Sequence, residues 1–549
     1  MKSRELNLFA IPTLLFATTL VFFPTTNYDP FNLPKFFSLT IFTVLLVGIA
    51  FLNSPIYATI HHKRLTYILL IFFVWMMIST IVSESNLTQK LFGIYGRQTG
   101  LITFTSLIVL MWITMQNARK LLAQKILQSL TISGIISGLY GLIQFAHQDP
   151  FNWQNPYSRV FGPMGNPNFH SAHMAMVALV SINLILHGKK DLKFKLIHVF
   201  TVALSLLNIY ATKSLQGGVI VVVIGLMLIT TVEYSNFMSK KFKYSFRILI
   251  GVAVIYFVLD VLQKAPWPSL FYKESVSIRG DLWRSAWRIF LDNPIFGIGL
   301  DEFRDYHRSY RDSRSLIHST NLLPADSTHN YFLDLLVGGG LPLALIYAGF
   351  QIYVFTIVCK QLVNASDLKI PFYGLSAVWF AFTLQSLISP GQIGILIWGW
   401  AVSGLIIGLD RTEGDTTLRK PTKELISIEN FGIITLLLFV SGSILIQPVL
   451  NDSKFFFAIK SNDKFALMSS VQKWPKSSVR LVSAAKILRL SGDEENGLLL
   501  AKEAVKFNGR YYEGWLEVYL NNSSSEEDKL LSRKNLTYLN PLIKVEELK

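Results

Sequence analysis

The chain has 549 residues, of which 51% are hydrophobic and 16% are charged, and its mean hydropathy is +0.40. Soluble domains usually contain about a quarter of charged residues, so this composition excludes an ordinary soluble protein. The formal net charge of +16 is carried largely by short loops between apolar blocks, and we expect no nucleic-acid partner. The single cysteine, Cys359, excludes an intrachain disulfide and a cysteine metal site.

Apolar residues form blocks that are long enough to cross a bilayer core of about 30 Å. The first block, roughly 6–23, follows Lys2 and Arg4. No small-residue cleavage site comes after it, so we expect a retained first span rather than a signal peptide. The predicted spans, about 13 in number, are roughly 6–23, 36–52, 66–83, 101–116, 126–146, 171–187, 196–211, 216–232, 246–262, 330–358, 371–388, 395–409 and 430–447. These spans predict an all-α polytopic membrane protein.

Basic residues alternate between successive loops. Clusters of Lys and Arg occur in the loops at 63–64, 119–120, 189–195, 240–243, 360–369 and 419–423. The loops between them are poor in such residues, which is the pattern that the positive-inside rule describes. We therefore predict a multi-pass protein of the cytoplasmic (inner) membrane, with its amino terminus inside and its carboxy terminus extracytoplasmic.

The block at 330–358 is too long for one straight span. Its "GGGLP" at 338–342 predicts a break between a short lead-in helix and the true crossing.

Two segments are expected outside the membrane. Residues 263–329 form a large loop on the outer face, within a membrane domain that we place at 1–447. Residues 448–549 are polar and predicted helical, and they form an extracytoplasmic region. The helices around Gly492 resemble one degenerate tetratricopeptide (TPR)-like unit, although a full array needs about three repeats. The alternative is a small helical cap on the outer face.

The large outer loop is unusually rich in cations, and arginine outnumbers lysine among them. They are Lys264, Lys273, Arg279, Arg284, Arg288, Arg304, Arg308, Arg311 and Arg314. Loops of this length can be translocated despite their charge. The arginine fork suits bidentate recognition of phosphate. The alternative for Arg284 and Arg288 is a solvated amphipathic helix whose tryptophans lie at the membrane interface.

Two further outer segments place cations among glycines and prolines. "GIYGRQTG" contains Arg97, and "YSRVFGPMGNPN" contains Arg159, Asn166 and Asn168. Glycine and proline allow close backbone approach and fixed turns. An arginine at this position is either a ligand for an anion or an anchor at the membrane rim.

Histidines also lie at the predicted outer rim. In "DSTHNYF", His329 and Asn330 come directly before an apolar run, and Asp326 could orient His329 or cap the following helix. The alternative for His329 is an interfacial histidine with no chemical role. The i, i+3 spacing of His170 and His173 could hold a metal, but no carboxylate accompanies them, so we expect no metal site. His318 is a second candidate base.

The order of four motifs resembles the O-antigen ligase superfamily, which also includes O-antigen polymerase-type enzymes and bacterial protein O-oligosaccharyltransferases. The motifs are "YGRQTGL", "RVFGPMGNPN", "IRGDLWRSAWRIFLDNPIFGIGLDEF" and "THNYFLDLLVGGGLP", and they lie within roughly 66–410. Gly297-x-Gly299 alone indicates no dinucleotide site, because no strand–helix unit surrounds it. Many relatives have a Ser-Arg pair where this chain has Ser214-Leu215, so Lys213 or Gln216 could take that polar role.

The resemblance implies a GT-C-type fold and a metal-independent, inverting glycosyltransferase without a cofactor. The donor would be a glycan on undecaprenyl diphosphate, and the acceptor a hydroxyl of a glycan, lipid or protein beside the membrane lipid. A neutral histidine can accept the proton of such a hydroxyl, and arginines can stabilise a departing diphosphate. The expected catalytic residues are His329, as general base or acceptor-orienting group, and Arg279, as diphosphate clamp. The expected substrate-binding residues are Arg97, Arg159, Asn166, Asn168, Lys213, Arg284 and Asn330.

The sequence is consistent with three functions. A ligase moves a preassembled glycan to an acceptor, whereas an O-antigen or exopolysaccharide polymerase adds it to another lipid-linked glycan. A lipid-linked glycan flippase is the remoter alternative, and it should have ionisable residues within its spans. The predicted spans are almost free of charge, which favours chemistry on one face of the membrane.

Overall fold

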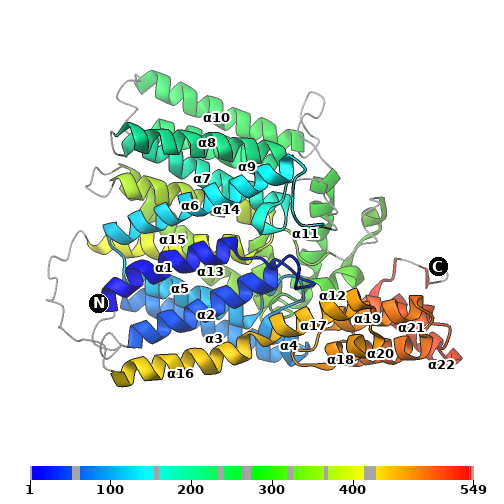
Figure 1. Ribbon diagram of the computed structural model, residues 1–549. Helices are drawn as coiled ribbons and strands as arrows, with labels where there is room; N and C mark the ends of the chain where they lie inside the picture. Colours follow the sequence, from blue (N-terminus) through cyan, green and yellow to red (C-terminus); the bar gives the residue numbers. More distant parts are fainter. Residues whose placement is uncertain are drawn as a thin grey trace.

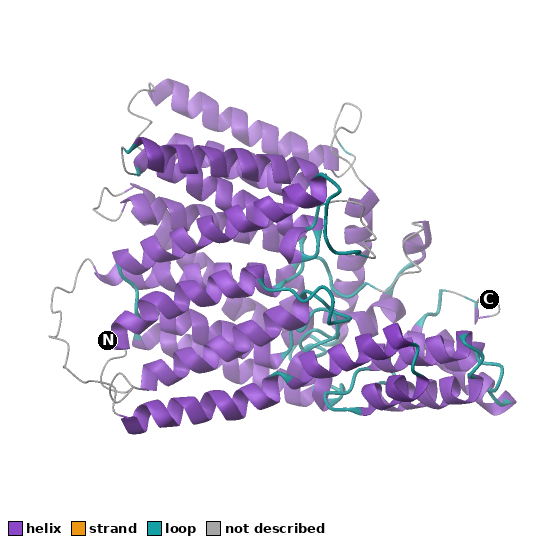
Figure 2. Ribbon diagram, in the orientation of Figure 1, coloured by secondary structure: helices purple, strands orange, loops and turns teal. Residues whose placement is uncertain are grey.

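The computed structural model describes residues 3–51, 62–153, 160–188, 191–231, 240–261, 264, 274–317, 325–363, 369–412, 428–542, 544 and 545. Within these ranges all regular elements are α-helices or 3₁₀ helices, and no strand occurs (Figure 2). The apolar helices lie side by side as one bundle (Figure 1).

Nine helices or continuous helix pairs of the described chain are long and apolar enough to cross a membrane. They are α2 (Asn32–Phe51), α3 (Lys63–Val82), α6 (Lys120–Phe145), α7 (Pro167–His187), α8 (Leu192–Ala211), α13 (Tyr331–Val363), α14 (Lys369–Ile388), α15 (Ile393–Thr412), and α16 (Ile428–Leu445) with α17 (Gln447–Ser461). Three more apolar helices are shorter: α1 (Ser3–Leu20), α5 (Leu101–Gln116) and α9 (Leu215–Thr231). Another predicted span coincides with α10 (Lys240–Val261). The all-α, multi-pass membrane class is confirmed, but the count of 13 spans is not.

The centre of the bundle is α15, which is almost entirely buried and packs on α5. Small residues allow this contact. A side chain at Gly404 would lie 2.4 Å from the backbone oxygen of Met111, and one at Gly408 would lie 2.5 Å from that of Met115. This small-x-x-x-small spacing is typical of close helix packing in membranes.

The predicted break in the long helix α13 is confirmed at Gly340, whose φ of 70° and ψ of −174° are not helical. The loop that precedes α12 (Phe303–His307) fills the break. Backbone N–H groups of Ile298 and Gly299 donate to the oxygens of Val337 and Gly338, at 2.9 and 3.0 Å. The long apolar run is thus interrupted by a loop that inserts from the outer segment.

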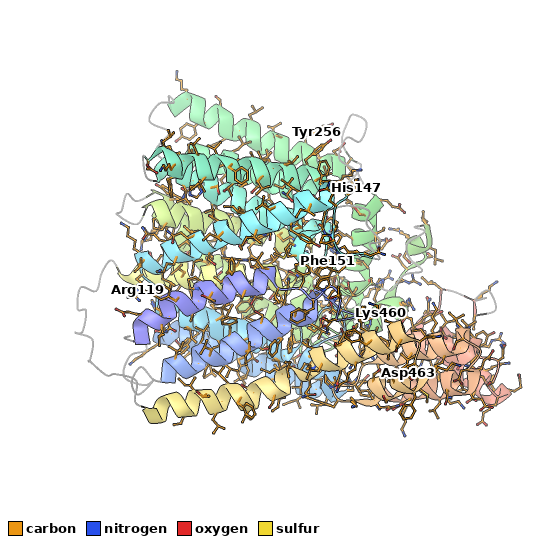
Figure 3. All side chains as sticks on the ribbon, viewed as in Figure 1. Arg119, His147, Phe151, Tyr256, Lys460 and Asp463 are labelled. Atoms are coloured by element: carbon orange, nitrogen blue, oxygen red, sulfur yellow. The ribbon has the colours of Figure 1, made fainter. Side chains whose placement is uncertain are left out.

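The two ends of the bundle differ. Loops, α4 (Leu87–Phe92), α11 (Glu274–Asp292), α12 and the C-terminal helices lie at one end, and the N-terminus lies at the other (Figure 1). Figure 3 places Arg119, in a predicted inner loop, opposite His147 and Phe151, in a predicted outer loop. We call the end that carries the C-terminal helices the loop end.

Six helices form the C-terminal region: α17, α18 (Lys464–Gln472), α19 (Ser478–Leu490), α20 (Glu494–Phe507), α21 (Tyr512–Leu520) and α22 (Glu526–Leu539). Neighbouring helices pack as pairs, with α19 against α20 and α21 against α22. Their buried residues form hydrophobic clusters separate from that of the membrane bundle. The domain boundary at 447/448 and the TPR-like character of this region stay predictions.

Candidate functional site

His329 lies in the turn that leads into α13. Its φ is +54°, which is unusual for a residue other than glycine. Thr328 fixes this turn, because its backbone N–H and hydroxyl both donate to Asp334 Oδ1, at 2.9 and 2.8 Å. The side chain of Asn330 accepts from the backbone N–H groups of Phe332 and Leu333, at 3.0 and 3.2 Å, and so caps the helix. The cap is therefore Asn330 and not Asp326.

The imidazole of His329 is half-buried, and no described residue forms a hydrogen bond with its ring nitrogens. Burial lowers the pKa of His329 to about 4; the charge of Asp326 opposes this shift, and the charges of Arg279 and Arg97 add to it. The ring is consequently neutral at pH 7, and a nitrogen lone pair is free to accept a proton.

Arg279 lies on the first turns of α11 and is half-buried. Burial lowers the pKa of Arg279, and no carboxylate of the described chain forms an ion pair with it. Its charge is one of those that lower the pKa of His329, so the two predicted catalytic residues lie in one electrostatic neighbourhood.

Arg284 and Arg288 have partners within their own loop. Arg284 forms ion pairs with Asp281 and, at 3.0 Å, with Asp312. Arg288 lies 3.5 Å from the same Asp312 carboxylate and donates to the backbone oxygen of Tyr310. These contacts favour the alternative of a solvated, ion-paired helix for both residues, and we leave Arg284 out of the proposed site.

Three further arginines of the outer loop contact the C-terminal region. The guanidinium of Arg304 lies 4.7 Å from the ring centre of Tyr511. Arg308 forms an ion pair with Glu513 at 2.7 Å and lies 4.2 Å from the ring centre of Tyr512. Arg311 donates a hydrogen bond of 2.8 Å to Asn540. Such stacked and ion-paired guanidinium groups hold two surfaces together. Most of the arginine excess in this loop is therefore structural.

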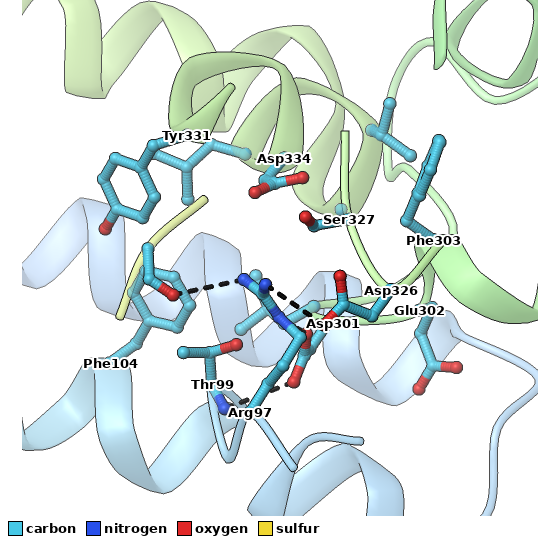
Figure 4. Close-up of a pocket in the computed structure, with 16 residues that line it drawn as sticks. Arg97, Thr99, Phe104, Asp301, Glu302, Phe303, Asp326, Ser327, Tyr331 and Asp334 are labelled. Atoms are coloured by element: carbon cyan, nitrogen blue, oxygen red, sulfur yellow. Dashed lines mark hydrogen bonds and ion pairs between the residues drawn. The ribbon is translucent and has the colours of Figure 1, made fainter. Parts of the chain in front are cut away.

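Arg97 connects several loops instead of standing free. Its Nε is 3.2 Å from Asp301 Oδ1, its Nη1 is 3.7 Å from Asp326, and its Nη2 donates to the backbone oxygen of Gly391. The other oxygen of Asp301 accepts from the backbone N–H groups of Ile94 and Thr99. Figure 4 shows these carboxylates around the guanidinium. We call Arg97, Asp301 and Asp326 the ionic hub.

A pocket of about 30 Å³ lies beside the ionic hub, and Tyr331, Asp334 and Phe104 also line it (Figure 4). This volume holds a few water-sized groups and no sugar ring. Asp326 is half-exposed at its edge, and the charge of Arg97, followed by that of His329, lowers the pKa of Asp326. The pocket therefore places charged groups beside one another.

The remaining predicted contacts lie around the starts of α7 and α9. Asn166 caps α7, and Asn168 accepts a hydrogen bond of 2.8 Å from Ser214 Oγ. Lys213 is exposed and has a φ of +52°. Gln216 is buried and exchanges hydrogen bonds with Ser389. Gln216 thus fills an internal polar position, and neither it nor Lys213 is placed beside His329 by a described contact.

Two candidates, Arg159 and His318, lie outside the described residues. His170 is buried and pairs through Nε2 with Asn208 Oδ1 at 3.0 Å, whereas the ring nitrogens of buried His173 have no described partner. Within the described ranges no group of three or more His, Cys, Asp or Glu residues could hold a metal ion.

Sequence reasoning gave Asp301 no specific role and gave Asp326 only alternatives. The sequence signal was the position of Asp301 just after Gly297-x-Gly299. In the structure Asp301 has a left-handed φ of +61°, which aspartate adopts more readily than most residues. Gly93 completes the arrangement, because a side chain there would meet Asp301 Oδ2 at 2.4 Å. The motif glycines thus permit the approach of two loops.

The fold and the site define a multi-pass, all-α membrane protein with an imidazole and arginines gathered in loops at one end. Residues 200–348 match the sequence model of the O-antigen ligase family (Wzy_C), and this segment includes both Arg279 and His329. The match bears out the predicted resemblance to the O-antigen ligase superfamily over this segment. Over this segment the similarity supports a glycan-processing membrane protein of the ligase or polymerase type.

A segment of 133 residues is 28% identical to the Teichuronic acid biosynthesis protein TuaE of Bacillus subtilis (strain 168). The match covers 24% of this chain and 25% of that protein. The chain thus matches about a quarter of the length of this curated relative.

Proposed function

We propose that this protein transfers a glycan from undecaprenyl diphosphate to an acceptor hydroxyl at the outer face of the cytoplasmic membrane. The observation that supports this most is the pair of Arg279, a half-buried cation without a described carboxylate partner, and neutral His329 in the same electrostatic neighbourhood. The family match covers both residues.

Arg279 would act on the leaving group. As the bond between the sugar and the diphosphate breaks, negative charge grows on the phosphate oxygen. A guanidinium in a half-buried place stabilises this charge more than an exposed one does, because the local dielectric is lower. Five other outer-loop arginines already have protein partners, so Arg279 is the half-buried cation that a diphosphate can best recruit.

His329 would act on the nucleophile. The acceptor oxygen attacks the anomeric carbon from the side opposite the diphosphate, its proton moves to His329, and the products are the inverted glycoside and free undecaprenyl diphosphate. The bound diphosphate brings negative charge close to the ring, so it raises the pKa of His329 above its value in the empty site. The base therefore becomes stronger when the donor is in place.

The ionic hub and Asn330 would position this pair. Arg97 already has two carboxylate partners, so we assign it to holding the loops together, not to binding diphosphate directly. Asn330 fixes the start of α13 and with it the turn of His329. No step of the proposed reaction requires a metal or a cofactor, because Arg279 would stabilise the negative charge on the leaving group.

The acceptor distinguishes a ligase from a polymerase. We propose transfer by a ligase as the first candidate, and addition to a second lipid-linked glycan by a polymerase as the alternative. The similarity to a teichuronic acid biosynthesis protein is compatible with a ligase and with a polymerase. Each of these two reactions would build envelope polysaccharide from lipid-linked units.

The test uses the protein in vesicles that contain a lipid-linked glycan and a candidate acceptor. Glycan on an acceptor without diphosphate identifies a ligase, and longer chains on the carrier identify a polymerase. Donor that only changes leaflet identifies a flippase and overturns the proposal. Arg279→Ala should abolish transfer, whereas Arg288→Ala, an exposed arginine of the same helix, should retain it. Transfer by Arg279→Ala at the wild-type rate would also overturn it.

A further inference from the structure

A second small cavity, of about 50 Å³, lies where the C-terminal region meets the membrane bundle. Its walls come from α4 and the following loop, from α12, and from the first turn of α19. The residues used below are Tyr95, Gln98, Arg304, Lys476, Ser477 and Arg480. Asn86 and Thr88 are only half-buried, so the cavity reaches the surface.

One wall of this cavity is the N-terminus of α19. Ser477 is the N-cap residue and has an extended backbone, but its side chain makes no capping hydrogen bond. The first backbone N–H groups of a helix have no partner within the helix, and the helix dipole makes this end electropositive. An uncapped helix start that faces a cavity favours an anion.

Arg480 provides an independent indication of a ligand. It lines the cavity and is only 3% exposed. Its Nη2 donates to the backbone oxygen of Pro475, but Nε and Nη1 have no hydrogen-bond partner. Buried guanidinium donors are almost always satisfied, because an unsatisfied charged donor is costly. Two such donors on a residue that lines the cavity indicate a missing acceptor.

The charges around the cavity do not neutralise Arg480. Arg304 and Lys476 are already paired, with Asp305 and Glu503 respectively. The carboxylate that acts on Arg480 is Asp452, which accepts hydrogen bonds from Tyr95, Asn27 and the backbone of Asp29, and lies beyond ion-pair distance of Arg480. Arg480 therefore has no carboxylate within ion-pair distance, although Asp452 acts on its charge from further away.

We propose that this cavity binds a single oxyanion group, the carboxylate or phosphate of an acidic glycan. The volume suits one such group and excludes a sugar ring, which would remain at the surface. The guanidinium of Arg480 provides two N–H donors, and the start of α19 provides backbone donors on the adjacent side. This site is separate from that of Arg279 and His329.

The cavity and the ionic hub share one loop. The loop from Gly93 to Gln98 lines this cavity on one side, and on the other side it holds Arg97 and the N–H of Ile94 that bind Asp301. An anion bound at Arg480 would thus join the C-terminal region to the loop that carries the ionic hub.

The test measures thermal unfolding of the purified full chain at constant ionic strength. Inorganic phosphate and glucuronate are the two probes, and glucose and chloride are the references. We expect one or both oxyanions to raise the unfolding temperature, with glucose and chloride inactive. A response to phosphate alone identifies a phosphate group as the ligand, and a response to glucuronate identifies a carboxylate. No response to either overturns the proposal.

Arg480→Met tests the residue itself. We expect the affinity for the active oxyanion to fall at least about ten-fold, since charged hydrogen bonds are lost. Without the anion, this variant should be as stable as the wild type, because an unpaired buried charge is removed. Lys486→Met removes an exposed cation from the same helix and should keep the response. Equal responses in both variants, or a loss of stability in Arg480→Met with the response intact, would overturn the assignment.

Discussion

Arg97 and Asp301 form an ion pair of 3.2 Å between residues that are 204 positions apart in the chain. Both side chains are more than nine-tenths buried. The same aspartate binds two backbone N–H groups of the loop that contains Arg97. This contact fixes the first outer motif against the large outer loop, and Asp326, in the segment that leads to His329, joins it through Arg97.

Asp301→Ala should therefore destabilise the loop end. Removing one partner of a buried ion pair leaves an uncompensated charge and costs about 3–5 kcal/mol. We expect a clear fall in the unfolding temperature and loss of transfer together. Arg288→Ala, which removes an exposed ion pair, should change stability by less than about 1 kcal/mol. Equal stability of Asp301→Ala and wild type would contradict the role of the ionic hub.

Gly340→Ala should disrupt the break in α13. A side chain there would lie 2.0 Å from the backbone oxygen of Ile295, and the φ of +70° is unfavourable for any L-residue. We expect a loss of at least about 1–3 kcal/mol in the free energy of unfolding. Gly349→Ala is the matched control in the same helix, since nothing lies within 4 Å of its added methyl group. Its stability should be unchanged or slightly higher. Similar effects of the two substitutions would show that the break tolerates a side chain.

Arg308→Ala should loosen the C-terminal region from the membrane bundle. This arginine is buried, forms an ion pair with Glu513 at 2.7 Å and lies over the ring of Tyr512. We expect faster hydrogen exchange and easier proteolysis in α21 and α22, while the membrane helices stay protected. Unchanged exchange in these two helices would mean that the other contacts suffice. Arg314→Ala, an exposed arginine of the same loop, serves as the control.

The pH dependence of transfer should report His329. Its pKa is lowered to about 4 by burial, so the ring is neutral and active above this pH and becomes protonated below it. We expect kcat/KM, which reports the free enzyme, to fall only near pH 4. The acid limb of kcat should lie at a higher pH, because the diphosphate of the bound donor raises the pKa of His329.

Folding stability should change with pH in the same direction as activity, falling as the pH falls. Since the pKa of His329 is lower in the folded than in the unfolded chain, its contribution to stability is complete above about pH 6.5 and is lost as the pH falls through about 4. An acid limb of kcat/KM above pH 7, or an identical limb in a His329 variant, would contradict its role as the base.

Much of the fold could be predicted from the sequence because the bilayer imposes a simple rule. Long apolar runs become helices, so each predicted span that falls on described residues coincides with a helix, and "GGGLP" becomes a break because Gly340 adopts a left-handed φ. The number of spans could not be settled in this way. Helices such as α5 and α9 are apolar but short, and α10 carries several charges.

The site was harder to predict because charge does not reveal its partner. Arginine in the outer loop suggested phosphate binding, but Arg284, Arg304, Arg308 and Arg311 have protein partners that come from distant segments. Only folding separates such residues from Arg279, which has none among the described residues. The same holds for Arg97, whose carboxylates come from two other loops.

The most direct test of the account compares transfer in single turnovers by Arg279→Ala, by a His329 variant and by the double variant. His329→Asn is preferred to His329→Ala, because asparagine tolerates the left-handed φ and lacks the base. We predict that each single variant is slower by at least about 100-fold. The double variant should be little slower than the worse single variant, because the two groups act in one transition state. A wild-type rate in either single variant would contradict the claim that Arg279 and His329 form one catalytic site.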